Sequence, residues 1–141
     1  MKRRKIKMDN NYIPLPSHLG DEIYPNGIFH FNISRIVEDI DYGILHMERE
    51  KIEVKRWFNT KTRGKINENH LLMVDVSRPI IQAEIRPGMF EIIDGNHRIE
   101  KAFRENIPTS PSYKLKGEQL ILYFKERDGY MAFVEYWNSK L

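Results

Sequence analysis

The chain of 141 residues contains no cysteine. This absence excludes disulfide bonds, cysteine-ligated zinc, iron–sulfur clusters and thiol nucleophiles. The chain also lacks a run of about 18 apolar residues, so we predict no membrane-spanning helix and no membrane partner. The basic start of the chain is not followed by the apolar stretch of a signal peptide. We therefore expect a cytoplasmic protein.

Hydrophobic residues make up 40% of the chain and charged residues 30%, a composition typical of a folded globular domain. The length fits one compact domain, which we predict to span residues 11–141. Residues 1–10 are expected to form a basic flexible tail, since five of the first seven residues are lysine or arginine. Such a tail is either a solvated chain end or a contact for the phosphates of DNA.

The N-terminal third of the chain carries one clear helical pattern. Residues 11–27 are rich in proline, glycine and asparagine, and we expect an irregular loop there. Phe29 and Phe31 alternate as in a short strand. Asn32 is placed to cap a helix that Gly43 ends. Apolar residues recur in this helix at i, i+3, i+4 and i+7: Ile33, Ile36, Val37 and Ile40.

The middle of the chain contains a strand pattern and a hairpin pattern. We predict a strand near residues 50–55, a helical turn around Trp57 and an exposed loop at 59–65. Residues 80–94 indicate a β-hairpin, because the proline and glycine between its halves suit a tight turn. A further strand is predicted at residues 112–115.

Two more helices complete the pattern. Helical spacing begins at Ile99, and Asn106 and Pro108 are placed to end that helix. A C-terminal helix is predicted from residue 130. The whole chain is therefore expected to be of the α+β class, a small mixed sheet with flanking helices. One face of the C-terminal helix is apolar: Tyr130, Phe133, Val134 and Trp137.

The stretch from Asp94 to Arg98 is the most distinctive feature of the sequence. A strand ends at Asp94, Gly95 allows an unusual backbone conformation, and Asn96 is placed to cap the next helix. His97 and Arg98 then fall in the first turn, where positive charge opposes the helix dipole at a cost of roughly 0.3–1 kcal/mol. A bound anion would offset that cost, and Arg98 offers a planar fork for phosphate oxygens. The alternative is structural: Asp94 pairs with Arg98, Asn96 only caps, and His97 packs.

Other residues extend this candidate site. Ser34, in the first turn of the early helix, either meets a phosphate or helps to cap that helix. Arg78 faces either the same site or solvent. Asp94 and His97 are the candidate catalytic acid–base residues; for Asp94 the alternative is a turn cap, or a partner that orients Arg98. The five histidines lack the close spacing of metal ligands, so no metal site is predicted.

The corner and its flanks resemble the ParB/sulfiredoxin superfamily. The resemblance covers about residues 28–125, and it is carried by Pro79-Ile80-Ile81, the hairpin, and the run from Ile93 to Ala102. Members share a Gly-x-[His/Arg]-Arg corner that binds nucleotide phosphates. The resemblance implies a similar fold and a bound nucleoside triphosphate, ATP or CTP, with or without Mg²⁺.

Two positions depart from the pattern of the superfamily. Asn96 stands where sulfiredoxins carry their cysteine, which excludes sulfiredoxin activity. His97 stands at the first arginine of the ParB corner, and the chain is too short to include the helix-turn-helix region of ParB. A helix near 32–40 lines the nucleotide pocket in family members. The predicted nucleotide ligands are therefore Gly95, Asn96, His97, Arg98, Ser34 and Arg78.

We expect a nucleotide-binding domain of the ParB/sulfiredoxin type. If the protein is an enzyme, phosphoryl transfer or nucleotide hydrolysis is the expected class, because positioning and charge stabilisation dominate that chemistry. One alternative is a non-enzymatic DNA-associated module, or a weak nuclease, which the basic tail favours. Another is a scaffold in which the corner is only a capped helix.

Overall fold

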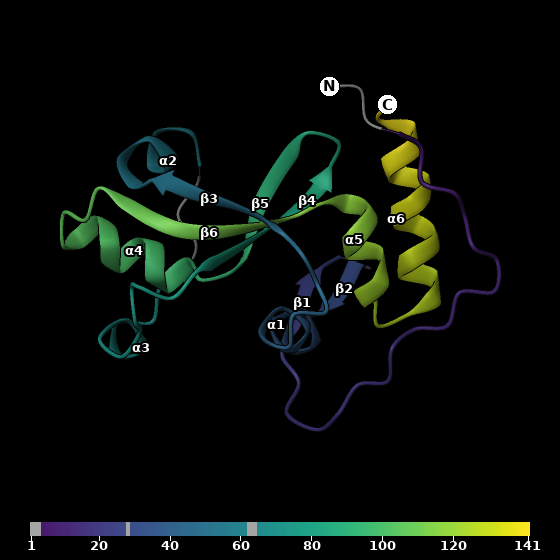
Figure 1. The fold of residues 1–141 in the computed structure, drawn as a ribbon, viewed down its shortest axis with the longest axis horizontal. Helices are drawn as coiled ribbons and strands as arrows, with labels where there is room; N and C mark the ends of the chain where they lie inside the picture. Colours follow the sequence, from purple (N-terminus) through teal and green to yellow (C-terminus); the bar gives the residue numbers. More distant parts are fainter. Residues whose placement is uncertain (1–3, 28, 62–64) are drawn as a thin grey trace. The chain divides into compact units, whose positions relative to one another are not determined.

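The structure is a computed structural model, and it describes residues 4–27, 29–61 and 65–141. Figure 1 shows a mixed α+β fold in which helices accompany a four-stranded and a two-stranded sheet, and this confirms the predicted fold class. The elements follow in this order: β1 (Ile23–Asn26), β2 (Phe29–Asn32), α1 (Ile33–Asp41), β3 (Glu48–Glu53), α2 (Val54–Thr60), α3 (Glu68–Leu71), β4 (Ile80–Arg86), β5 (Met89–Asp94), α4 (Asn96–Arg104), β6 (Thr109–Leu115), α5 (Gly117–Leu120), a 3₁₀ turn η1 (Ile121–Tyr123) and α6 (Arg127–Ser139).

The larger sheet has the strand order β3-β6-β4-β5, so β3 lies at one edge. β3 and β6 are antiparallel, and their register places Arg49 opposite Tyr113 and Lys51 opposite Pro111. β4 and β5 form the predicted hairpin, and Gly88 in its turn adopts a φ of 79°. β1 and β2 pair antiparallel in the smaller sheet.

Contacts within the chain divide it into two compact units that interleave along the sequence. Unit 1 takes in the described residues up to Met47, together with Ala83–Glu91 and Leu115–Leu141. Unit 2 takes in the described residues of Glu48–Gln82 and Ile92–Lys114. The sequence predicted one domain over residues 11–141. β4 and β5 each contribute residues to both units.

Unit 1 is built on buried aromatic rings. Phe31 of β2 and Phe124 are fully buried and meet edge to face, with ring centroids 4.9 Å apart. Phe133 of α6 packs on Phe124 at 5.1 Å, and the predicted apolar face of α6 is buried as expected. Asn32 caps α1 as predicted, because its side chain accepts a hydrogen bond from the Arg35 N–H at 3.0 Å.

Residues 4–9 lie along α6 in unit 1. Ile6 is buried, and its backbone exchanges two hydrogen bonds of 2.9 Å with the Asn138 side chain. The Trp137 indole donates to the Arg4 carbonyl at 3.1 Å. This part of the segment that was predicted to be a flexible tail is therefore attached to the helix, while Lys5 and Lys7 on either side of Ile6 are exposed.

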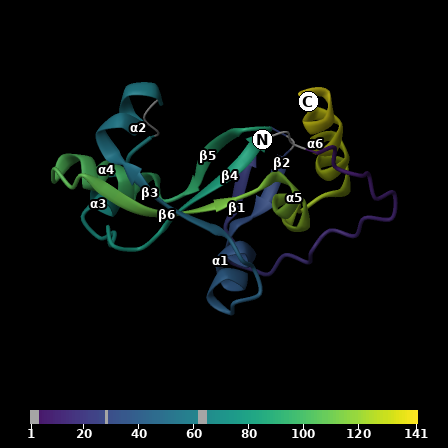
Figure 2. The same ribbon diagram turned by 45° about the horizontal axis from the view of Figure 1, so that its top comes forward.

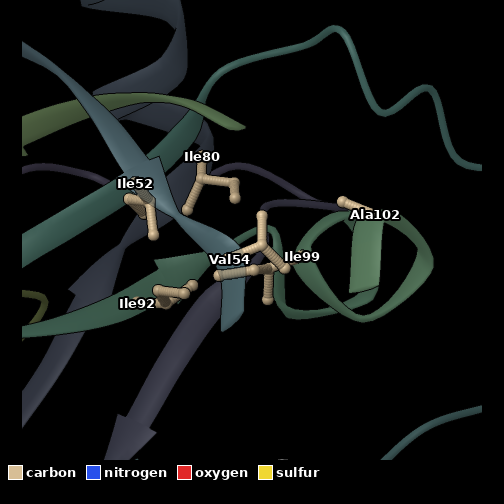
Figure 3. Close-up of a cluster of buried hydrophobic side chains, with 6 residues drawn as sticks. All are labelled: Ile52, Val54, Ile80, Ile92, Ile99 and Ala102. Carbon is tan, nitrogen blue, oxygen red and sulfur yellow. The ribbon is translucent and has the colours of Figure 1, made fainter. Parts of the chain in front are cut away.

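Unit 2 has a small apolar core to which α2 and α4 contribute side chains. Both views show these two helices beside β3 and β6 (Figures 1 and 2). Figure 3 shows the six buried side chains of this core pointing toward one another. Phe58 and Phe103 pack at its margin with ring centroids 5.0 Å apart. Burial of apolar surface stabilises such a core by about 25 cal/mol per Å². Its members are Ile52, Val54, Ile80, Ile92, Ile99 and Ala102.

Several elements differ from the predictions. Residues 11–27 were expected to be irregular throughout, but β1 occupies Ile23–Asn26. The short helices α3 and α5 were not predicted. Residues 62–64 of the predicted loop at 59–65 lie outside the described residues. No helix within the described ranges is long and apolar enough to cross a membrane.

Candidate functional site

The corner between β5 and α4 is shaped by Gly95. Its φ of 109° is positive, a backbone conformation that residues with a side chain rarely adopt. A Cβ atom added there would lie 3.0 Å from Ile80 Cγ1 and 3.2 Å from Arg98 Nη1. Ile80 is fully buried in the core of unit 2. Glycine is therefore required at this position by both backbone conformation and space.

The start of α4 differs from the prediction that Asn96 caps it. Gly95 is the N-cap residue, and its carbonyl accepts the first helical hydrogen bond from the Ile99 N–H at 3.1 Å. Asn96 is the first helical residue, and it is exposed. The prediction was wrong because the left-handed glycine turns the chain into the helix one residue early. The first N–H groups of α4 receive no capping side chain from the N-cap residue.

Arg98 points inward from the first turn of α4. Its Nη1 donates to the Pro79 carbonyl at 2.8 Å, and its side chain is 14% exposed. Its Nη2 lies 3.6 Å from Asp94 Oδ2, which is an ion pair but longer than a direct hydrogen bond. Asp94 therefore lies where it orients the guanidinium, the role that we gave as its structural alternative. One of the five guanidinium donors is used by the Pro79 carbonyl.

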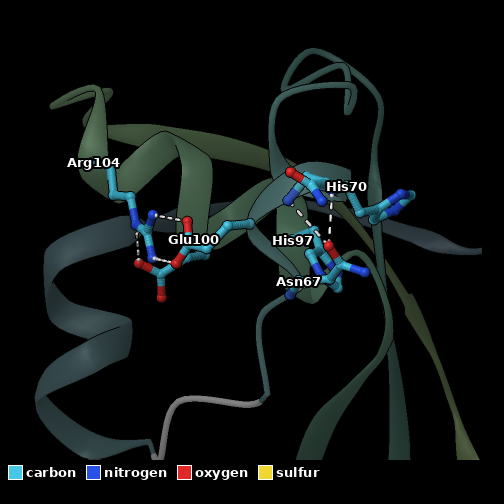
Figure 4. A network of polar contacts seen from close by, with 7 residues as sticks. Asn67, His70, His97, Glu100 and Arg104 are labelled. Carbon is cyan, nitrogen blue, oxygen red and sulfur yellow. Dashed lines mark hydrogen bonds and ion pairs between the residues drawn. The ribbon is translucent and has the colours of Figure 1, made fainter.

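His97 is held by the segment that leads into α3 (Figure 4). Its Nε2 accepts a hydrogen bond from the Asn67 N–H at 3.1 Å, so the imidazole is neutral and carries its proton on Nδ1. The His70 ring meets it edge to face at 4.6 Å. Burial, and then the neighbouring His70, lower the pKa of His97 below its usual value. The structural alternative for His97 is thus supported in part. The Asn67 N–H occupies one of its two ring nitrogens, Nε2.

A second polar network in Figure 4 ties α3 to the last turn of α4. Arg104 donates to the Glu100 carboxylate at 3.0 Å and to both carboxylate oxygens of Glu68, at 2.6 and 2.9 Å. The hydrogen bonds from Arg104, and then its charge, lower the pKa of Glu68. This arginine is wholly engaged in structural pairs, which makes it a useful contrast to Arg98.

Acidic and basic groups are balanced around the corner. Hydrogen bonds from Ser77, and then the charges of Arg78 and Arg98, lower the pKa of Asp75. Arg78 and Arg98 are thus both close enough to act on one carboxylate, and Arg78 itself is exposed. Asp75 and Asp94 thus offset part of the positive charge of Arg78 and Arg98.

Ser34 belongs to unit 1, whereas the corner belongs to unit 2. Its hydroxyl accepts a hydrogen bond from the Glu22 N–H at 2.7 Å. The capping role that we gave as its alternative falls to Asn32 instead. Its predicted contact with a phosphate stays a prediction.

Sequence reasoning missed three groups that position the corner. They are the Pro79 carbonyl, Asn67 with its backbone N–H, and Lys101, whose ammonium donates to the Val74 carbonyl at 3.0 Å. Asn67 caps α3 by accepting from the Asn69 and His70 N–H groups, and the preference of asparagine for the N-cap was a signal that could have been read. The two carbonyls carry no signal in the sequence.

Comparisons with protein-family models, with curated proteins and with solved structures gave no match. The resemblance to the ParB/sulfiredoxin superfamily therefore depends on the residues of the corner and its flanks alone, and it stays a prediction. Among the residues that the structure describes, no three histidine, aspartate or glutamate side chains converge as a metal site.

Proposed function

We propose that the corner at Asp94–Arg98 binds the phosphates of a nucleoside triphosphate, ATP or CTP, in the manner expected of a ParB/sulfiredoxin-like domain. The observation that carries the proposal is the start of α4. Its N-cap is a glycine without a capping side chain, so the first N–H groups and the helix dipole point toward the site. The protein places positive side chains there, where acidic ones are usually preferred.

The position of Arg98 supports the same proposal. The hydrogen bond to the Pro79 carbonyl fixes the guanidinium. Its Nη2 atom lies 3.6 Å from the Asp94 carboxylate, which is too far for a direct hydrogen bond between these two groups. Donors that are fixed before a ligand arrives lose less entropy on binding. Asp94 keeps the guanidinium oriented while the site is empty, and a phosphate would take its place as the nearer partner.

A catalytic step, phosphoryl transfer or hydrolysis, is the further part of this proposal. The Nε2 atom of His97 accepts a hydrogen bond and therefore carries no proton, which makes His97 the candidate acid–base residue. Its Nε2 accepts the Asn67 N–H, so this hydrogen bond must break before Nε2 can accept a proton from a substrate. Asp94 is the alternative base. A Mg²⁺ ion bound with the nucleotide would supply charge stabilisation of the phosphates, and it would need few ligands from the protein.

Isothermal titration of the full chain with ATP and with CTP, with and without Mg²⁺, tests the binding step. We expect heat of binding from the unaltered protein and none from the Arg98→Ala variant. Arg104→Ala is the matched control, since it removes an arginine of the same helix that is engaged in structural pairs only. Unfolding curves of both variants show whether each is folded.

Asp94→Asn adds a second test with the opposite sign. Removing one negative charge about 4 Å from the guanidinium should strengthen phosphate binding by at least about fivefold, the effect of such a charge in water, because both side chains are largely buried. If the unaltered protein gives no heat with either nucleotide, or if Arg98→Ala binds as tightly as the unaltered protein, the corner is a structural joint and the proposal fails.

A further inference from the structure

The edge strand β3 places two cations on one face. Its sequence, Glu-Arg-Glu-Lys-Ile-Glu, alternates in sign, and alternate residues of a strand point to opposite faces. Arg49 and Lys51 therefore share one face with the residues that pair with them on β6, Tyr113 and Pro111. We name this set of four residues the ribbon face. Both of its charged residues are basic, and both are exposed.

The neighbouring acidic residues are neutralised by other cations. The Glu50 carboxylate, on the opposite face of β3, pairs with Lys114 at 3.0 Å and accepts from Gln82 at 3.4 Å. Glu53 lies on the same face of β3 as Arg49 and Lys51, next to the ribbon face, and its carboxylate pairs with Arg56 at 3.6 Å. These pairs leave the positive charge of Arg49 and Lys51 as the dominant charge on the ribbon face.

The ribbon face also carries an aromatic platform beside a hollow. The Arg49 guanidinium lies over the Tyr113 ring, 5.5 Å from its centroid. These two residues line a cavity of about 300 Å³, large enough for one planar base, and the remaining lining residues are Glu50, Lys51, Pro79, Pro111 and Ser112. The Glu50 carboxylate at this cavity is the one paired with Lys114. An arginine plane and a tyrosine ring are the groups on which unpaired bases stack.

A second hollow continues the basic surface from β3 onto α2. It has a volume of about 540 Å³, and exposed Lys55 lines it beside the half-buried Phe103 and the paired Glu53 and Arg56. Lys55 follows Lys51 by four residues across the junction of β3 and α2, so cations recur along this part of the chain. The surface thus combines a row of cations with two hollows that each contain an aromatic side chain.

We propose that single-stranded nucleic acid binds along the ribbon face, with one base stacked at Arg49 and Tyr113 and the backbone continuing past Lys51 toward Lys55. Cations at alternate strand positions are about 7 Å apart, which suits an extended phosphodiester chain better than a compact ligand. A duplex would bury its bases away from Tyr113. This proposal does not use the corner at Asp94–Arg98, so either proposal can fail without the other.

Fluorescence anisotropy of a labelled 12-nucleotide oligo(dT), titrated with the full chain, tests the proposal. We expect binding that weakens with salt, and a duplex of the same length should bind less tightly. Arg49→Ala and Lys51→Ala should each weaken binding about fivefold at 0.1 M salt and reduce the logarithmic salt slope by about 0.7, the value for one phosphate contact of a single strand. Arg86→Ala is the control, because Arg86 is an exposed arginine on β4 outside the ribbon face.

Two further variants separate base stacking from charge and from folding. Tyr113→Ala should weaken binding at least about fivefold, while Tyr113→Phe keeps the ring and should bind within about twofold of the unaltered protein. Circular dichroism of each variant reports whether it is folded. A Lys5→Ala/Lys7→Ala variant tests the N-terminal segment.

Three results would overturn the proposal. The first is binding that is lost in the Lys5/Lys7 variant and kept in Arg49→Ala, since the N-terminal segment would then be the contact. The second is equal competition by a glutamate peptide of the same charge, since stacking would then contribute nothing. The third is the absence of any salt-dependent anisotropy change with the unaltered chain.

Discussion

Replacing Gly95 by alanine should destabilise the protein by two separable effects. A non-glycine residue at positive φ costs about 1–2 kcal/mol, and the φ of 109° lies beyond the usual left-handed region. The new methyl group would also lie 3.0 Å from Ile80 Cγ1, which is closer than ordinary van der Waals contact. Inserting a methyl group into a packed site costs about 1–3 kcal/mol. The expected loss in the free energy of unfolding is therefore about 2–5 kcal/mol.

Gly43→Ala isolates the backbone effect. Gly43 also has a positive φ, 72°, but a Cβ atom added there would meet nothing within 4 Å. We expect this variant to lose about 1–2 kcal/mol from backbone strain alone. The difference between the two variants then measures the crowding against the fully buried Ile80, together with the added backbone strain of a φ of 109° over one of 72°.

Urea unfolding followed by circular dichroism measures both losses. The slope of each transition should stay equal to that of the unaltered protein, since neither change alters the surface exposed on unfolding. If Gly95→Ala and Gly43→Ala lose the same free energy to within about 0.5 kcal/mol, the tight packing at the corner is not what requires glycine, and the reasoning fails.

Three further predictions concern titration and the N-terminal segment. His97 has a lowered pKa, so it binds its proton less readily in the folded than in the unfolded protein. Its contribution to stability should be constant above about pH 6.5 and fall as the pH drops toward the lowered pKa, and a His97→Asn variant should lack this fall in thermal unfolding scans. Arg104→Ala should return the pKa of Glu68 toward its ordinary value in an NMR titration; Glu68 helps stability above that ordinary value, and the help is lost as the pH falls through the lowered one. Asn138→Ala removes both hydrogen bonds to the Ile6 backbone and should cost about 1–3 kcal/mol, with faster trypsin cleavage near the N-terminus as the readout.

Long amphipathic segments were predictable from the sequence because their periodicity extends over several turns. α1 and α6 formed where apolar residues recur at helical spacing, and Asn32 caps α1 as its residue type indicates. α3 and α5 have four residues each, which is too short for a helical period to appear. β1 contains Pro25, a residue that argues against a strand unless, as here, the strand has a single pairing neighbour.

The candidate site was only partly predictable, because half of its contacts use main-chain groups. The strand, the glycine and the helix appear where the sequence indicated, but the helix begins one residue earlier than an asparagine cap requires. The partner of Arg98 is the Pro79 carbonyl, and the partner of His97 is the Asn67 N–H. Every residue carries such groups, so residue types alone cannot show which of them a side chain will reach.

The positive charge in the first turn of α4 now has a structural explanation as well as a functional one. Arg98 holds Pro79 and lies beside Asp94, so its position is stabilised without a bound anion. The charge conflict with the helix dipole therefore no longer requires a ligand by itself. The bare glycine cap also has a structural reason, because a serine or aspartate cap would stabilise the helix by about 1 kcal/mol but would introduce the Cβ atom that Ile80 excludes. A phosphate at the corner would therefore be bound by the N–H groups that this glycine leaves uncapped, with Arg98 as the side chain fixed beside them.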